Sequence, residues 1–187
     1  MRPRYRLVPA LLAALLAGRL AAATAPEPPG LWGGEERGAV PATLAGGRVV
    51  DTAALAALLA QGGTGDGVVA VDVSVAQRRP EGLPPGAVWL PLAHRDIAGS
   101  VWLPDAGQSA LPPATEAWVR QRLEALTGGD PARPVVFYCH PECWRSWNAA
   151  KRAVGWGYRA VMWYPQGVEG WGEAGHTLAP ARAEAAP

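Results

Sequence analysis

The chain has two cysteines, Cys139 and Cys143, which lie four positions apart in a sequence of 187 residues. Other side chains that could react or bind stand between and beside them: His140, Glu142, Trp144 and Arg145. A thiolate is stabilised where a strand runs into a helix N-terminus, because unpaired backbone N–H groups and the helix dipole face it. The pattern therefore predicts thiol chemistry centred on Cys139, with Arg145 supplying a fixed positive charge.

Two residues of the same loop oppose the binding of an anion. Pro141 has no N–H group and restricts His140 to extended conformations, so the loop offers fewer amides to an anion. Glu142 places a carboxylate beside Arg145, and much of the attraction for a phosphate would cancel. These features favour sulfur or redox chemistry over anion hydrolysis.

Three roles are open for Cys143. At helical spacing it shares a stripe with Trp147, Ala150 and Val154, which turns its sulfur toward the core and leaves Cys139 as the exposed cysteine. It is then a small buried hydrophobic residue, a thiol that resolves an intermediate on Cys139, or the disulfide partner of Cys139. A separation of four residues around a turn permits two Cα atoms within disulfide range.

Two kinds of ligand are not expected. Cys139, His140 and Cys143 offer soft ligands for a zinc ion, but no second cluster supplies a clear fourth, and His94 and His176 stand alone. The formal net charge is +1 without a basic stripe, so nucleic acid is not an expected partner.

Alternating helices and strands must position the cysteine loop. Capping signals and helical periodicity predict helices over residues 53–61 and 112–127, and a third helix that begins around Trp144. Apolar runs predict strands over residues 68–73, 87–90, 134–139 and 160–164. The alternation predicts an α/β domain with a central, mostly parallel sheet and helices on both faces.

Other candidate site residues follow from this arrangement. Cys139 would lie at the C-terminal edge of the sheet, where ligands gather, and Asp72 ends a strand at the same edge. Arg95 and His94 stand in a polar segment, residues 92–97, and are further candidates for lining a site. The sequence Gly86-Ala-Val-Trp-Leu-Pro91 nearly recurs as Gly99-Ser-Val-Trp-Leu-Pro104, which predicts two similar short extended segments.

The N-terminus carries an export signal pattern. Residues 1–23 combine a basic start, a short apolar core and small residues at the end, as in a cleavable signal peptide with cleavage after Ala23 or Ala25. A retained amphipathic anchor is the alternative. Export would place the cysteines in an oxidising compartment. No later apolar run reaches membrane length, so no membrane span is expected after removal of the signal.

The rest of the chain divides by composition. Residues 24–48 are rich in Pro, Gly and Ala, which predicts a loosely ordered N-terminal arm that Trp32 could pin down. Residues 49–173 form the predicted domain. Residues 174–187 contain mainly Ala, Pro and charge, which predicts a disordered tail.

Four segments taken in order resemble the rhodanese-like domain, a parallel α/β fold with its cysteine on a strand-to-helix loop. They are residues 69–73, 85–91, 135–146 and 167–171. The resemblance covers residues 49–173, and within it Cys139 matches the residue that carries a persulfide in sulfurtransferases.

A narrower resemblance is to the PQQ-dependent catabolism-associated CXXCW motif proteins, an exported rhodanese-like group. It is carried by residues 99–104, Cys143-Trp144, and residues 146–152, 163–165 and 170–171. The resemblance implies a periplasmic protein associated with quinoprotein alcohol oxidation or transport components. The association with PQQ enzymes is indirect, and no bound cofactor is expected.

Two departures from these families keep several functions open. Three residues separate the cysteines where the CXXCW motif has two, and the spacing from Cys139 to Arg145 equals the Cys-x5-Arg length of cysteine phosphatases. The leading hypothesis is thiol, persulfide or disulfide redox chemistry at Cys139 and Cys143. The alternatives are a non-catalytic partner- or cofactor-binding module with a structural disulfide and, less favoured by Pro141 and Glu142, a phosphatase.

Overall fold

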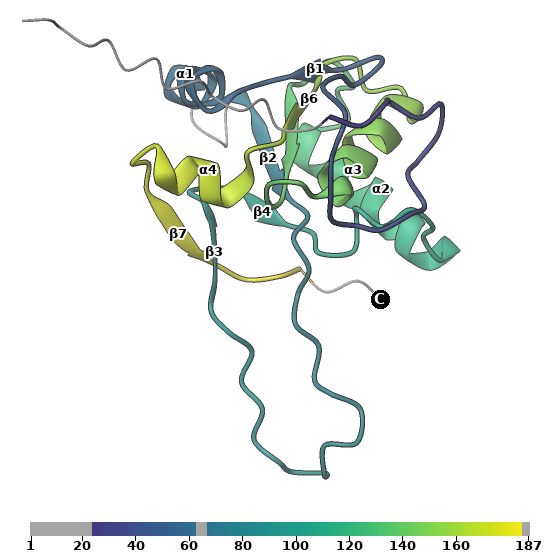
Figure 1. The fold of residues 1–187 in the computed structure, drawn as a ribbon, viewed down its shortest axis with the longest axis vertical. Helices are drawn as coiled ribbons and strands as arrows, with labels where there is room; N and C mark the ends of the chain where they lie inside the picture. The colour runs from purple at the N-terminus through teal and green to yellow at the C-terminus, as the bar shows by residue number, and fades with distance from the viewer. Residues whose placement is uncertain (1–23, 63–66, 185–187) are drawn as a thin grey trace, which may run out of the picture.

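The computed structural model describes residues 24–62 and 67–184, so the predicted signal peptide, residues 1–23, lies outside the described residues. A five-stranded parallel sheet has the order β1-β6-β5-β2-β4, and a separate antiparallel pair joins β3 and β7 (Figure 1). The strands are β1 Arg48–Val49, β2 Val69–Asp72, β3 His94–Ile97, β4 Val101–Trp102, β5 Val135–Tyr138, β6 Val161–Tyr164 and β7 Leu178–Ala181. The helices are α1 Thr52–Gly62, α2 Pro113–Thr127, α3 Trp144–Gly155 and α4 Gly167–Glu173.

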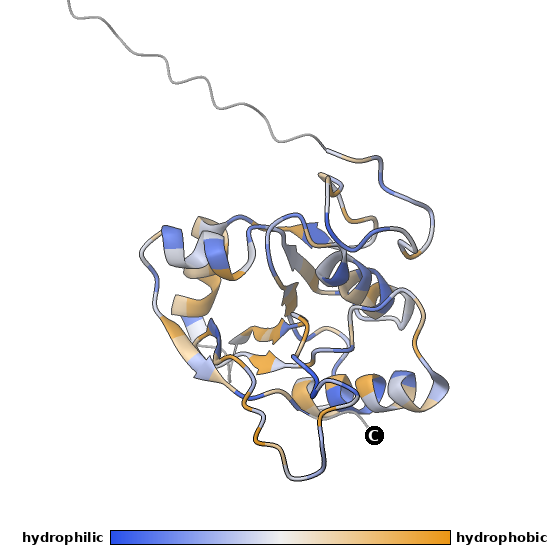
Figure 2. Cartoon of the chain, turned by 60° about the horizontal axis from the view of Figure 1, so that its bottom comes forward, coloured by the Kyte–Doolittle hydropathy of each residue, from blue (hydrophilic) through white to orange (hydrophobic). Residues whose placement is uncertain are grey.

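Helices cover both faces of the parallel sheet, as the sequence predicts. Alternate residues of each central strand enter two separate cores, because successive strand side chains point to opposite faces. Val135 and Phe137 of β5 pack with α2 and α3, whereas Val136 and Tyr138 pack with α1 and α4. Apolar residues gather on the central strands and on the helix faces turned toward them (Figure 2). The predicted α/β class is confirmed.

The three predicted helices form close to their expected bounds. The second begins directly after Pro112, and proline is tolerated there because the first helical N–H groups have no partner within the helix. It ends at Gly128, which adopts a left-handed conformation with φ of 65° and caps the last turn. Among the described helices, only the short α4 was not predicted, because its glycine-rich sequence has no clear helical period.

The strand predicted over residues 87–90 is not formed. The near-repeat at Gly99–Pro104 takes the position beside β2, where Val101 pairs with Val71 and Trp102 with Asp72. The first copy instead lies in a long loop that projects from the body between β2 and β3 (Figure 1). The two copies have nearly the same local sequence, so the sequence predicts the same structure for both. Only one copy can pair with β2, and this choice depends on the tertiary fold.

Two further predictions for irregular segments are corrected by the β3–β7 pair. Residues 94–97, expected in a polar loop, form β3, and residues 178–181, expected in a disordered tail, form β7. The Arg95 guanidinium also donates a hydrogen bond to the Leu178 carbonyl. These contacts come from backbone pairing and one side chain, so the apolar periodicity of the sequence does not reveal them.

The N-terminal arm, residues 24–48, is also more fixed than its composition predicts. It has little regular structure before β1, but its Glu27 carboxylate binds both the Thr43 hydroxyl and the Lys151 ammonium group of α3. Trp32 exchanges hydrogen bonds with the Asn148 side chain, which accepts at 2.8 Å and donates at 3.0 Å. The arm therefore docks on α3. Among the described helices, none is long and apolar enough to cross a membrane.

Candidate functional site

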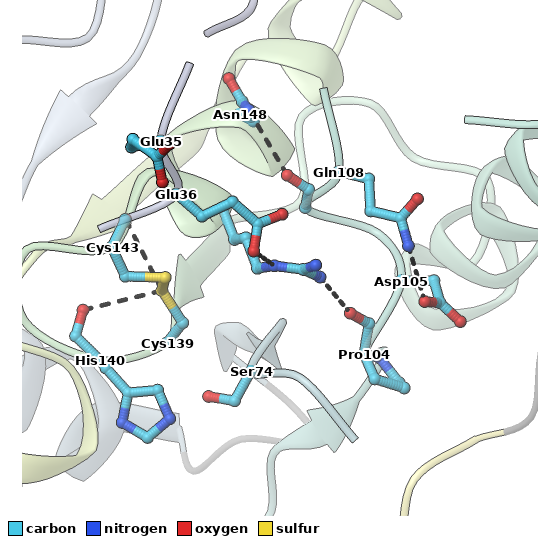
Figure 3. A network of polar contacts seen from close by, with 12 residues as sticks. Glu35, Glu36, Ser74, Pro104, Asp105, Gln108, Cys139, His140, Cys143 and Asn148 are labelled. Carbon is cyan, nitrogen blue, oxygen red and sulfur yellow. Dashed lines mark hydrogen bonds and ion pairs between the residues drawn. A yellow bond between two sulfur atoms is a disulfide. The ribbon is translucent and has the colours of Figure 1, made fainter. Parts of the chain in front are cut away.

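The two cysteines form a disulfide between the end of β5 and the start of α3. Cys139 directly follows β5, Cys143 is the N-cap residue of α3, and their Cα atoms are 6.6 Å apart (Figure 3). Of the three roles open to Cys143, the structure shows the disulfide partner. The loop between them is turned by Glu142, which is exposed and adopts a left-handed backbone conformation with φ of 54°.

The burial of the cysteines differs from the prediction that Cys139 is the exposed one. Cys139 is 0% exposed and Cys143 is 6% exposed. Cys139 enters the core between the sheet and the helices α2 and α3, together with Trp147. Cys143 stands before the first helical turn in an extended conformation, so the expected helical stripe does not include it. Of the two residues, Cys143 is the more exposed.

Ser146 is a neighbour of the disulfide that the sequence analysis did not single out. Its Oγ lies 3.2 Å from Cys139 Sγ and 3.3 Å from the Cys143 carbonyl oxygen. The indole N–H of Trp163 donates to the same Oγ at 3.0 Å. Because the indole can only donate, the hydroxyl proton of Ser146 is left to point at one of the other two partners. A serine on the first turn of a helix gives no sequence signal for such a role.

Arg145 is nearly buried but its described contacts do not include a sulfur atom. Its Nε donates to Glu36 of the arm at 2.8 Å, and its Nη1 donates to the Pro104 carbonyl at 3.1 Å. Arg145 is therefore close to the cysteines in the sequence, as expected. Its guanidinium, however, pairs with Glu36 and not with Glu142. A cavity of about 390 Å³ lies on the side of Arg145 and is also lined by Arg78 and Asp105.

The arm also covers the N-terminus of α3, where free amides were expected. The Trp144 N–H donates to the Glu36 carbonyl and the Gly38 N–H donates to the Glu142 carbonyl, each at 2.9 Å. Arg37 forms an isolated antiparallel bridge with Cys143. Trp144 is buried under Trp32, with their rings stacked at 4.3 Å. The arm thus covers the loop. It occupies the Trp144 N–H, one of the amides that were expected to stabilise a Cys139 thiolate.

Helix α4 closes the other side of the loop. The Val168 N–H donates to the Cys139 carbonyl at 2.9 Å, and His140 Nδ1 lies 2.7 Å from Glu169. Gly167 adopts φ of 59°, and a side chain there would collide with the backbone of Cys139 and His140. Only glycine fits this position, because both its conformation and its surroundings exclude a Cβ atom.

Asp72 and Arg95 do not contact the cysteines in the structure. Asp72 is fully buried at the end of β2, where its Oδ1 accepts the Ser74 N–H and its Oδ2 lies 2.7 Å from His94 Nε2. Arg95 is exposed and holds β7 as described above. The polar end of β2 therefore builds a second cluster, centred on His94, beside the strand that carries Cys139.

Two titratable groups of this second cluster have shifted pKa values. Burial, and then the nearby Asp72, raises the pKa of Asp96 to about 6 from its ordinary 3.8, although His94 opposes the shift. Burial raises the pKa of Tyr138 well above its usual range, and Asp72 adds to the effect. The Tyr138 hydroxyl donates to Ser100 Oγ at 2.7 Å and accepts the Ile97 N–H at 3.0 Å.

The fold and the site define an α/β domain with a cysteine loop between a parallel strand and a helix. The rhodanese-like domain model matches residues 52–174, which is more than half of the chain. The chain belongs to the rhodanese-like family.

Comparison with curated proteins gives no match. Among solved structures, an uncharacterized protein from Saccharomyces cerevisiae is similar at 22% sequence identity, with a TM-score of 0.39. The match covers 68% of this chain and 92% of the yeast chain.

Proposed function

We propose that this protein is a periplasmic thiol–disulfide protein of the rhodanese-like family whose reactive group is the Cys139–Cys143 pair. The observation that carries the proposal is the disulfide itself, placed on the strand-to-helix loop where the family fold presents its cysteine. The pair occupies the position at which the resemblance implies sulfur chemistry. Reversible opening of this bond is the function that the site supports best.

The exchange step begins at Cys143, because Cys143 is the more exposed of the two residues. A thiolate of a partner dithiol attacks Cys143 Sγ, forms a mixed disulfide and displaces Cys139 as a thiolate. The second thiol of the partner then attacks the partner's own sulfur in the mixed disulfide and releases Cys143. Two electrons pass from the partner, which leaves as a disulfide, to the cysteine pair. Ser146 stands where its hydroxyl can donate to the departing Cys139 sulfur.

Sulfur transfer uses the same pair in its reduced form. The Cys139 thiolate attacks the outer sulfur of thiosulfate, and sulfite leaves as that S–S bond breaks. The Cys143 thiolate then attacks Cys139 Sγ, hydrosulfide leaves, and the disulfide forms again. In this cycle the disulfide is the product of resolution, and an external dithiol must reduce it before the next round.

The proposed setting is the periplasm, in association with PQQ-dependent alcohol catabolism. What supports it is the signal-peptide pattern of residues 1–23 and the resemblance of several segments to the CXXCW group. Components of quinoprotein alcohol oxidation or transport are the proposed partners. The association requires no PQQ molecule bound to this chain.

A second function has one observation in its favour. Both cysteines are buried and the arm covers their loop, as suits a disulfide that only staples a binding module. In such a module, the Trp32–Trp144 stack and the docked arm would hold a partner without any cycling of the cysteines. The reduction potential separates the two functions.

Alkylation of the full chain, followed by mass spectrometry, tests the proposal. Without reductant we expect no alkylated cysteine, and after equilibration with a dithiol buffer we expect two. A reduction potential above about −300 mV supports a cycling pair, because structural disulfides of secreted proteins lie below that value.

Matched variants complete the experiment. Cys143→Ser leaves Cys139 without a partner, so we expect one alkylated cysteine and, after thiosulfate, the added mass of one sulfur atom on Cys139. A potential well below the structural threshold, together with no added sulfur, would assign the disulfide to the stapling role.

A further inference from the structure

A pocket of about 410 Å³ lies outside the cysteine loop, at the base of the long loop between β2 and β3. Its volume falls within the usual range for small-molecule sites. Its walls come from both ends of that loop, from the first residue of β3, from β4, and from the last residue of β7 with the two residues that follow it. The residues that line it include Val75, Gln77, Leu92, His94, Trp102 and Arg182. No residue of the cysteine loop lines it.

His94 is held rigidly at the wall of this pocket. Its Nε2 lies 2.7 Å from Oδ2 of the buried Asp72, and its ring stacks on Trp102 with centroids 3.9 Å apart. Trp102 is itself fixed, because its indole N–H donates to the Ser74 carbonyl at 2.7 Å. No described residue hydrogen-bonds to His94 Nδ1. A part-buried imidazole is thus oriented by its neighbours while one ring nitrogen stays available to a ligand.

The other polar side chains that line the pocket can also donate hydrogen bonds. Gln77 accepts the Leu92 N–H with its Oε1 at 2.9 Å, which leaves its amide N–H groups without a described acceptor. Arg182 forms no ion pair within the described part of the chain. No aspartate or glutamate lines this pocket, and Val75, Leu92 and Trp102 give it apolar walls. The lining is therefore largely apolar and includes one arginine.

We infer that this pocket binds a small monocarboxylate with an apolar body, whose carboxylate meets Arg182 and whose apolar part lies against Val75, Leu92 and Trp102. A planar guanidinium pairs with a carboxylate through two parallel hydrogen bonds. His94 and Gln77 contribute further donors to the same ligand, His94 when it carries its second proton. The inference does not depend on the chemistry of the cysteines.

The acidic residues nearby do not line the space that the carboxylate would occupy. Asp72 is fully buried, and both of its oxygens are used by Ser74 and His94. Asp96 and Glu184 line a neighbouring cavity of about 230 Å³, which shares Trp102 and Arg182 with this pocket.

Calorimetric titration of the oxidised full chain tests the inference with phenylacetate and with phenylacetamide, its uncharged analogue of nearly the same shape. We expect phenylacetate to bind at least about tenfold more tightly than the amide, since one charge-assisted hydrogen bond supplies that difference. Arg182→Gln should weaken phenylacetate binding by about tenfold or more and leave amide binding unchanged.

Arg159→Gln is the matched control, because Arg159 is exposed and lies outside this pocket. It removes the same charge and should leave both affinities unchanged. Absence of phenylacetate binding, equal affinities for the acid and the amide, or equal effects of the two arginine variants would each overturn the inference. Oxidised protein is used throughout, so the outcome is independent of whether the cysteines cycle.

Discussion

At the scale of single residues, Ser146 links the core to the reactive sulfur. Its hydroxyl accepts from the Trp163 indole and lies within hydrogen-bonding distance of Cys139 Sγ. In the disulfide the sulfur is a weak acceptor, but a Cys139 thiolate would be a strong one. The same hydroxyl therefore stabilises the reduced state more than the oxidised state.

Ser146→Ala is expected to make the reduction potential of the disulfide more negative. Loss of a hydrogen bond to a charged group costs about 1.5 kcal/mol or more. For a two-electron couple this corresponds to about 30 mV. Equilibration with glutathione buffers measures the shift. Ser109→Ala removes an exposed hydroxyl and should not move the potential, and an equal potential in wild type and Ser146→Ala would exclude the role of Ser146.

Asp96 is a buried carboxyl group whose charged form lowers the stability of the folded state. It is 3% exposed, and its Oδ2 has no hydrogen-bond partner among the described residues. Its pKa rises from 3.8 to about 6 on folding, chiefly through burial. Between these values the folded state binds a proton that the unfolded state has lost, so the free energy of unfolding falls as the pH rises.

Asp96→Asn should therefore stabilise the protein at neutral pH by about 3 kcal/mol, because the pKa of Asp96 rises from 3.8 to about 6 and one pKa unit corresponds to about 1.4 kcal/mol. The variant should also flatten the decrease in stability between about pH 4 and 6. Urea unfolding at a series of pH values measures both effects. Glu173→Gln removes an exposed charge as the control, and a variant no more stable than wild type at neutral pH would contradict this account of Asp96.

At the scale of elements, the arm lies over the cysteine loop, and we expect it to limit access to the disulfide. Its contacts at the loop include backbone hydrogen bonds from residues 36–38, the Glu36–Arg145 ion pair and the Trp32–Trp144 stack. Each contact is modest alone, and exposed ion pairs in particular contribute little. We expect that they must all be broken before an external thiol reaches Cys143.

Trp32→Ala is expected to speed reduction of the disulfide by dithiothreitol by about tenfold, since loss of an aromatic stack of about 1 kcal/mol and of its burial favours the undocked arm. The rate at fixed pH is followed by alkylation. Trp156→Ala is the control, because this indole follows the C-terminal end of α3 and packs under Arg120 of α2. Equal reduction rates in the two variants would show that the arm does not limit access.

Prediction from sequence succeeded for elements with a strong apolar pattern. It failed for elements that form chiefly through backbone pairing with a distant segment. Strands β2, β5 and β6 are continuous apolar runs, so their positions could be predicted. Strands β3 and β7 carry charged or proline-containing sequences and form because they pair with each other. The docking of the arm has the same origin, in partners more than 100 residues away.

At the scale of the whole molecule, the site joins segments that are far apart in the chain. The spacing of Cys139 and Cys143 identified the loop but left open whether they pair, because spacing alone does not fix the backbone between them. The partners of Arg145 and the position of Ser146 required the folded arrangement. The class of fold needed only the alternation of helices and strands.

The docked arm has a consequence for the order of events during biosynthesis. Glu36 and Arg145 are separated by 109 residues, so the arm is synthesised long before the helix on which it docks. N-terminal segments emerge first, and contacts of such separation form late. Cys139 and Cys143 therefore pass through an interval in which their loop exists and no cover lies over it. The disulfide forms most readily during that interval. If the arm docks while the cysteines are still reduced, the disulfide can afterwards form only as fast as the arm undocks.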